Sequence, residues 1–249
     1  MSQLESKVII VTGALGAIGG ATAGLLAQAG ARLVLTDISD TGGSALAERL
    51  SAEGGEASFF AADLVDEDQA RALVDHAVSR FGRLDGAFNN AGVAQNNKPI
   101  IEMTSAEWTR VLQINATSMF HCVKHQMIAM KDGGSIVNTS SGLGVIAIPN
   151  AAEYIASKHA VCGLTRAAAV EGAPMGIRVN TVLPGAVRTP LLESTFDTPE
   201  KLDQLNKLHP IGRTGEPEEI GNLVRWLLSD EASFITGSLY AVDGGYTMV

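Results

Sequence analysis

Short apolar runs alternate along this chain with longer segments of helical spacing. The runs lie at 7–12, 31–37, 57–63, 84–92, 134–141, 177–185 and 238–245. Between them, apolar side chains recur on one face of a helix, as at Ala70, Leu73, Val74 and Ala77. Strands that are nearly all apolar are buried on both faces, and short strand–helix–strand connections are right-handed. The pattern predicts an α/β fold with a doubly wound sheet of about seven parallel strands.

The length favours one domain over residues 1–249, because a chain of this size with 46% hydrophobic residues can bury one large core. Its 18 basic residues are scattered among 27 acidic ones, with a net charge of −9. This balance excludes nucleic acid and an anionic membrane as natural partners and favours a small molecule. No apolar run reaches the roughly 18 residues that span a bilayer. With two distant cysteines, Cys122 and Cys162, expected to be reduced, the sequence predicts a cytoplasmic protein.

A strand, a glycine-rich turn and a helix are expected over 11–30. Gly13, Gly16 and Gly19 are spaced by three, which is not the G-x-G-x-x-G fingerprint. Glycines let backbone N–H groups approach a pyrophosphate, and the following helix directs its positive end at the anion. Tight packing explains such glycines equally well, so this turn alone is a weak indication of a nucleotide site.

Asp37 ends the second expected strand, about 20 residues after the glycines, where an acidic side chain can bind both ribose hydroxyls. The Asp37 carboxylate would repel the 2′-phosphate of NADP. For two unit charges 4 Å apart, this repulsion is about 1 kcal/mol in water and about 4 kcal/mol at an effective dielectric of 20. With no basic residue in 12–19, the pattern favours NAD over NADP. A turn or N-cap aspartate is the structural alternative.

Polar and small residues follow each expected strand, where open α/β sheets bind their ligands. They are Thr12-Gly13, Asp37, Asp63, Asn89 to Gly92, Ser140-Ser141 and Pro184-Gly185.

Tyr154 and Lys158 stand at i and i+4 in a segment that reads as helix, so both side chains emerge on one face. An ammonium near a phenol stabilises the phenolate and suits the pair to proton transfer. The pair alone proves little, since such pairs also occur without a function.

Together with Ser141 and Asn115, these motifs resemble the short-chain dehydrogenase/reductase family over the whole chain, in its form of about 250 residues. One departure is Ala17, where the family usually has its middle glycine. The resemblance implies a Rossmann-type fold and a single dinucleotide-binding and catalytic domain. It also implies that Tyr154 is the general acid/base and that Ser141 binds the substrate oxygen. Lys158 would lower the tyrosine pKa and hold the nicotinamide ribose, and Asn115 would support a water that leads protons out to solvent.

The resemblance also implies a set of residues that bind the cofactor NAD. Besides Tyr154 and Lys158 they are Gly13, Gly16, Ile18, Gly19, Asp37, Ile38, Asp63, Leu64, Asn90, Ala91, Gly92, Pro184, Gly185, Val187 and Thr189.

Substrates of the family lie between the segment after the catalytic serine and a variable lid, here about 190–213. Both are apolar, so we expect a hydrophobic or alicyclic secondary alcohol and its ketone. The expected substrate residues are Ser141, Val145, Ile148, Tyr154, Leu191, Leu192 and Phe196.

Two alternatives remain. One is reduction of a 3-oxoacyl group on acyl carrier protein. Asp37 and the net charge of −9 argue against it, and such reductases have arginines at the positions that match Asp132 and Met175. The other is a non-catalytic NAD-binding protein, which would typically lack the tyrosine or the lysine.

His121 and His125 share a helix face, but no third ligand is evident in the sequence, so no metal is expected. Helices are expected at 104–131 and 152–173, with apolar residues on more than one face, such as Met119, Phe120, Val161 and Leu164. The family commonly pairs these two helices across a twofold axis and packs a second interface with a C-terminal strand like 238–249. The resemblance therefore implies a homotetramer, with a dimer as the alternative.

Overall fold

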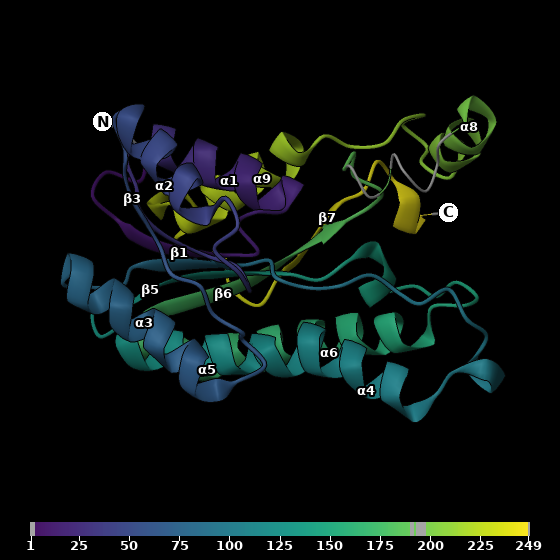
Figure 1. The fold of residues 1–249 in the computed structure, drawn as a ribbon, viewed down its shortest axis with the longest axis horizontal. Coiled ribbons are helices and arrows are strands. Elements are labelled where there is room, and N and C mark those ends of the chain that lie inside the picture. The colour runs from purple at the N-terminus through teal and green to yellow at the C-terminus, as the bar shows by residue number, and fades with distance from the viewer. Residues whose placement is uncertain (1–2, 190–191, 193–197, 249) are drawn as a thin grey trace.

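The fold is one parallel sheet between two layers of helices, as Figure 1 shows for the computed structural model, which describes residues 3–189, 192 and 198–248. The seven strands have the order β3-β2-β1-β4-β5-β6-β7. They are β1 (Val8–Thr12), β2 (Arg32–Thr36), β3 (Glu56–Phe59), β4 (Gly86–Asn89), β5 (Gly134–Thr139), β6 (Ile177–Pro184) and β7 (Leu239–Val242). The predicted fold class is confirmed. β1 ends at Thr12 as predicted, and the other six strands end earlier than predicted, because the residues after them leave the ladder.

The helices connect the strands and cover both faces of the sheet. They are α1 (Ala17–Gln28), α2 (Gly43–Ala52), α3 (Glu67–Phe81), α4 (Ser105–Leu112), α5 (Ser118–Ala129), α6 (Ala152–Gly172), α8 (Pro199–Lys207) and α9 (Pro217–Leu228). In Figure 1, α1, α2 and α9 cover one face, and α3, α4, α5 and α6 lie on the other. No helix in the described part of the chain is long and apolar enough to cross a membrane.

Each face of the sheet has its own apolar core, because successive strand residues point to opposite sides. Ile9 and Val11 of β1 pack into one cluster with Leu26 of α1, and Val8 and Ile10 pack into the other. All of these side chains are buried. The nearly continuous apolar strands of the sequence therefore fill both layers.

Polar residues fix where several helices begin. The Asp66 side chain accepts a hydrogen bond from Asp68 N at the start of α3, and α3 ends at Gly82 in the left-handed conformation. Thr104 and Glu107 form a reciprocal capping box at the start of α4. These local signals place each helix relative to the strand it follows or precedes.

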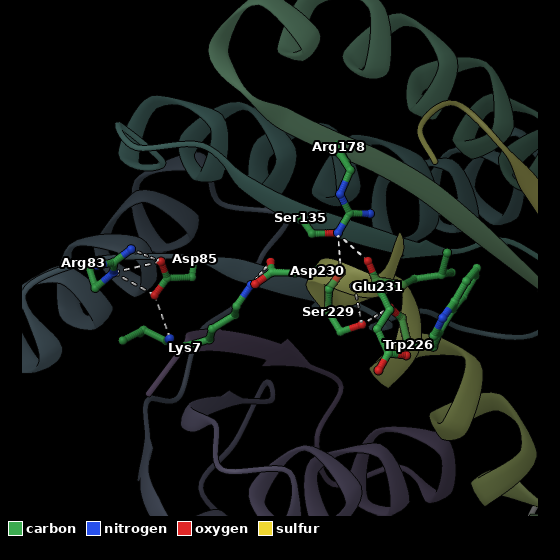
Figure 2. A network of polar contacts seen from close by, with 11 residues as sticks. Lys7, Arg83, Asp85, Ser135, Arg178, Trp226, Ser229, Asp230 and Glu231 are labelled. Atoms are coloured by element: carbon green, nitrogen blue, oxygen red, sulfur yellow. Dashed lines mark hydrogen bonds and ion pairs between the residues drawn. The ribbon is translucent and has the colours of Figure 1, made fainter. Parts of the chain in front are cut away.

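A polar network ties the amino ends of the strands together, at the opposite edge from the predicted site (Figure 2). Asp85 accepts hydrogen bonds from Val8 N, at 2.9 Å, and from the Arg83 guanidinium. Arg178 of β6 donates to Ser229 O at 2.9 Å, beyond the end of α9. Burial lowers the pKa of Arg178, because it removes water from around the charged guanidinium. The polar groups at this edge stabilise the fold, and the predicted site lies at the opposite edge, at the carboxyl ends of the strands.

Candidate active site

The glycine turn after β1 allows the strand, the turn and α1 to lie very close. Gly13 has φ of +64°, and a Cβ there would lie 2.9 Å from Ala91 Cα. A Cβ at Gly19 would lie 2.1 Å from Gly13 O. Only glycine fits at these two positions, so the packing explanation of the turn holds. Gly16 is the N-cap of α1, and Ile18 packs against the core.

A cavity of about 240 Å³ opens beside this turn, at the carboxyl ends of the central strands. The predicted cofactor residues that line it are Gly13, Asp37, Ile38, Asp63, Leu64, Ala91 and Gly92. The remaining lining is mostly apolar, including Ala62, Val65 and Ile114. Two wider hollows, of about 480 and 490 Å³, lie away from all these predicted residues. A mostly apolar wall with two carboxylates, those of Asp37 and Asp63, is compatible with an adenosine.

Asp37 is anchored to the glycine turn. One carboxylate oxygen accepts a hydrogen bond from Leu15 N at 3.1 Å, and the other accepts one from Ile38 N at 2.9 Å. Each oxygen retains lone pairs for further donors. The N-cap of α2 is Gly42, so the helix-cap explanation for Asp37 does not apply.

Thr12 holds the end of β4 against the end of β1. Its hydroxyl oxygen accepts hydrogen bonds from Asn90 N at 2.9 Å and Ala91 N at 3.0 Å. The Asn90 side chain lies between Gly13 O and the Thr139 hydroxyl, at 3.4 and 3.3 Å. The predicted Asn90–Gly92 segment is thus fixed beside the cavity from two strands.

Asn115 lies in a π-helical turn, Gln113–Thr117, between α4 and α5. The helix predicted at 104–131 is present as a continuous helical run from Ser105 to Ala129, but it contains this π-turn, which the sequence does not predict. Turns of this kind often occur at functional sites. The buried Asn115 amide oxygen accepts from Val93 N at 2.8 Å. Its amide nitrogen donates to Val93 O at 3.0 Å and to Ser157 Oγ at 3.1 Å. The widened turn brings this amide to the loop after β4.

Ser141, Tyr154 and Lys158 come together at the end of β5. Ser141 caps the short helix Gly142–Gly144, and its side chain lies close enough to the Tyr154 phenol to lower the pKa of that phenol. Lys158 Nζ lies 5.5 Å from the centroid of the Tyr154 ring and donates to Thr139 O at 3.1 Å. The helix α6 presents both of its residues toward the serine, as the i, i+4 spacing predicts.

Burial dominates the electrostatics of this group. Burial raises the pKa of the Tyr154 phenol, and the hydrogen bond with Ser141 opposes this in part. Burial lowers the pKa of Lys158 to about 8. The sequence predicts that Lys158 lowers the tyrosine pKa. In this structure the pKa rises instead, because burial disfavours the charged phenolate.

The turn after β6 carries the last predicted cofactor residues and lies outside the cavity. Gly185 N donates to Val242 O at 3.1 Å, which fixes the turn that starts at Pro184 to β7. Val187 is bridged to Gly215. Thr189 Oγ1 accepts from Leu192 N at 3.1 Å.

Besides Ser141 and Tyr154, three predicted substrate residues can be placed. Val145 is 44% exposed beyond the short helix that Ser141 caps, and Ile148 and Leu192 are half-buried. Leu191 and Phe196 lie outside the described residues.

One charged residue beside the site was missed by sequence reasoning. Glu153, directly before Tyr154, is fully buried and accepts from Asn96 N at 2.7 Å and from Asn96 Nδ2 at 3.0 Å. A glutamate in the first turn of a helix normally signals a solvated N-terminus, so nothing in the sequence reveals that it clamps a distant loop.

The histidine pair has an acidic neighbour that the sequence did not reveal. Glu67 Oε1 accepts from Lys124 Nζ at 2.6 Å and lies 3.1 Å from His125 Nε2. Both contacts lower the pKa of Glu67. Across residues 3–189, 192 and 198–248, no group of three or more His, Cys, Asp or Glu side chains is placed to hold a metal.

Comparisons with known proteins agree with this geometry. A family model described as enoyl-(acyl carrier protein) reductase matches residues 13–247. The 2,5-dichloro-2,5-cyclohexadiene-1,4-diol dehydrogenase of Sphingobium indicum is 46% identical over 253 residues, with 100% of both chains covered. The chain belongs to the short-chain dehydrogenase/reductase family.

Two further members of the family extend the comparison. Cyclohexanol dehydrogenase of an Acinetobacter species is 43% identical over 248 residues, which cover 99% of this chain and 97% of the relative. The crystal structure of levodione reductase has 36% sequence identity and a TM-score of 0.94, with 99% of each chain covered. Short-chain dehydrogenases use a nicotinamide cofactor.

Proposed function

We propose that this family member is an NAD(H)-dependent oxidoreductase that interconverts a hydrophobic or alicyclic secondary alcohol and its ketone. The observation that carries the proposal is that Ser141, Tyr154 and Lys158 meet at the end of β5, with Lys158 Nζ 5.5 Å from the centroid of the Tyr154 ring. It places a proton donor and acceptor at the end of β5, on the edge where the cavity lies. Relatives named for cyclohexanol, a cyclohexadienediol and levodione support an alicyclic substrate.

In alcohol oxidation, the Ser141 hydroxyl holds the substrate oxygen, and the ionised Tyr154 oxygen takes the proton of the alcohol. When bound, the nicotinamide supplies the acceptor for the hydride that leaves the carbinol carbon. In ketone reduction, Tyr154 returns its proton to the carbonyl oxygen. The alcohol thus loses one proton and one hydride and becomes the ketone.

Lys158 supplies positive charge to this reaction. With a pKa of about 8, it is mostly protonated at neutral pH, and its position over the tyrosine ring favours the phenolate during proton transfer. We propose that it also holds the nicotinamide ribose. Asn115 keeps the loop after β4 in place, and we assign it the water that leads protons out to solvent.

Asp37 is proposed to select NAD. Its two oxygens stand at the end of β2, on the cavity wall, where the ribose hydroxyls would donate to them. A 2′-phosphate there would meet a negative charge. We assign the adenine to the space between Ile38 and Leu64, and the carboxamide and diphosphate to Val187 and Thr189.

Carrier-bound substrates are the competing class, which the description of the family model also names. Asp132 and Met175 are exposed, and the glycines that follow them are in contact, since Gly134 N donates to Gly176 O. Asp132 and Met175 lie at the amino edge of the sheet, opposite the predicted site, and offer a carboxylate and a thioether at the positions where the resemblance implies arginines in carrier-protein reductases.

Initial rates with NADH and NADPH, each with cyclohexanone and with an acetoacetyl thioester, test the proposal. We expect NADH with the cyclic ketone to be preferred. A preference for NADPH and the thioester would contradict it.

We propose a homotetramer in the cytoplasm. Phe120 and Ile128 of α5 and Val170 of α6 are 46%, 63% and 76% exposed, which leaves apolar surface on the two helices that the family pairs. Met119 and Val161 are buried within the chain and do not contribute to it. Both cysteines are unpaired and buried, which suits a reducing compartment. Light scattering coupled to gel filtration tests the assembly, and a monomer would contradict it.

A further inference from the structure

His209 is a buried histidine that takes no part in the proposed chemistry. It follows α8 at the end of the predicted lid, with 3% of its surface exposed. Its ring stacks on Tyr246, with the centroids 5.3 Å apart. A buried imidazole with a defined neighbour on each side calls for an explanation beyond packing.

The two ring nitrogens have opposite hydrogen-bonding roles. Nδ1 lies 3.0 Å from Leu205 O, so it carries the proton and donates to that carbonyl. Nε2 lies 3.1 Å from Ala186 N and accepts from it. Only the neutral Nδ1-protonated tautomer makes both bonds. His209 therefore joins the last turn of α8 to the turn after β6.

The turn after β6 depends on this contact. Ala186 N is bound by His209, and Ala186 O accepts from Gly215 N at 2.9 Å. On the other side, a Cβ at Gly185 would lie 3.0 Å from His209 Nε2 and 2.9 Å from Asp243 Cα. The turn is thus enclosed between His209 and the C-terminal segment, which fixes its height above the sheet.

We infer that His209 is a positioning residue that couples the lid to the cofactor-binding turn, by holding the Ala186 N–H beside Pro184–Val187. The inference rests on the proposed function, because that turn is where we place the nicotinamide carboxamide. Loss of the acceptor would leave a buried N–H unpaired and loosen the turn. The effect would fall on cofactor affinity more than on the chemical step.

Two amide substitutions separate the two bonds. In His209→Gln, the amide reaches the place of Nε2 and keeps an acceptor for Ala186 N. In His209→Asn, it reaches only the place of Nδ1. We expect the Asn variant to bind NADH about tenfold more weakly, in a fluorescence titration, with kcat within about threefold of wild type. The Gln variant should stay within about threefold of wild-type affinity.

His76→Asn is the control, since His76 also lies against an aromatic ring, that of Phe60, with the centroids 5.1 Å apart and the rings tilted, far from this turn. It should bind NADH as wild type does. Equal NADH affinity in His209→Asn and wild type would overturn the inference, and so would equal losses in the Asn and Gln variants. Failure of the wild-type protein itself to bind NADH would instead refute the proposed function.

A measurement without any substitution covers the case in which a variant does not fold. NADH should slow amide hydrogen exchange in residues 205–215 as well as in the turn at 184–189. Slowing confined to 184–189 would overturn the coupling through His209.

Discussion

Asn115 and Val93 are joined by two hydrogen bonds, with the amide oxygen accepting from Val93 N at 2.8 Å and the amide nitrogen donating to Val93 O at 3.0 Å. One side chain thus satisfies both backbone groups of a residue that does not lie in a strand or helix. The pairing is possible because the π-turn at Gln113–Thr117 carries Asn115 into the interior. It fixes the loop that follows Gly92, beside the cavity.

Replacement of Asn115 by alanine should lower the free energy of unfolding by about 2–3 kcal/mol, because two buried backbone groups lose their partner. Chemical denaturation measures this value. Asn222→Ala, on the exposed face of α9, is the matched control and should change stability by less than about 0.5 kcal/mol. Equal stability of the Asn115 variant and wild type would show that the two hydrogen bonds between Asn115 and Val93 do not stabilise the fold.

Two glycines of α1 should respond oppositely to alanine. Gly19→Ala places a methyl group 2.1 Å from Gly13 O and should cost about 1–3 kcal/mol while weakening NADH binding. Gly24→Ala meets nothing within 4 Å and should stabilise the helix by up to about 1 kcal/mol. Melting temperatures and NADH titrations of both variants check this. A Gly19 variant as stable as wild type would contradict the close packing of the turn.

The cofactor preference should depend on Asp37. Asp37→Asn removes the negative charge with little change of shape and should reduce the preference for NADH over NADPH by about tenfold or more. The ratio of kcat/KM values measures it. Asp40→Asn, three residues away, controls for a general change of charge and should leave the ratio unchanged. An unaltered ratio in the Asp37 variant would remove Asp37 from cofactor selection.

The buried Lys158 predicts a pH dependence of stability. The unfolded chain holds this proton up to the ordinary pKa of 10.5, whereas the folded protein releases it near pH 8. Between these values the unfolded state binds more protons, so this group makes the free energy of unfolding rise with pH. Below pH 8 its contribution is constant.

Urea denaturation of wild type and Lys158→Met between pH 7 and 10 tests this dependence. The stability of wild type should rise relative to the variant from about pH 8 upward. Lys207 is an exposed residue of α8, and the Lys207→Met variant is the control. Its free energy of unfolding should change with pH in parallel with that of wild type. Parallel curves for the Lys158 variant would mean that the lysine keeps its ordinary pKa.

The sequence predicts the parallel sheet well, because apolar strands buried on both faces have a distinctive pattern. It also places Ser141, Tyr154 and Lys158 together, since a strand end and the i, i+4 spacing of a helix are local features. Asp37 and Gly13 on the cavity wall follow from the rule for strand ends. Their catalytic and binding roles stay predictions.

What the sequence does not reveal depends on contacts between distant segments. The π-turn at Asn115 shifts the helix by less than one turn, and helical periodicity does not resolve such a shift. Glu153 and His209 have ordinary surface signatures, and only the fold shows that Asn96 and Ala186 lie against them. The rise in the Tyr154 pKa likewise comes from burial, which spacing does not show.

The most direct test of the proposed activity is the rate of NADH formation from NAD and cyclohexanol by wild type and by Tyr154→Phe. Wild type should turn over the alcohol, and the variant should lose about 100-fold to 10,000-fold in kcat while still binding NADH. Tyr240→Phe, in β7, is the matched control and should keep full activity. Turnover by the Tyr154 variant at the wild-type rate, or no oxidation of cyclic alcohols by wild type, would contradict the account.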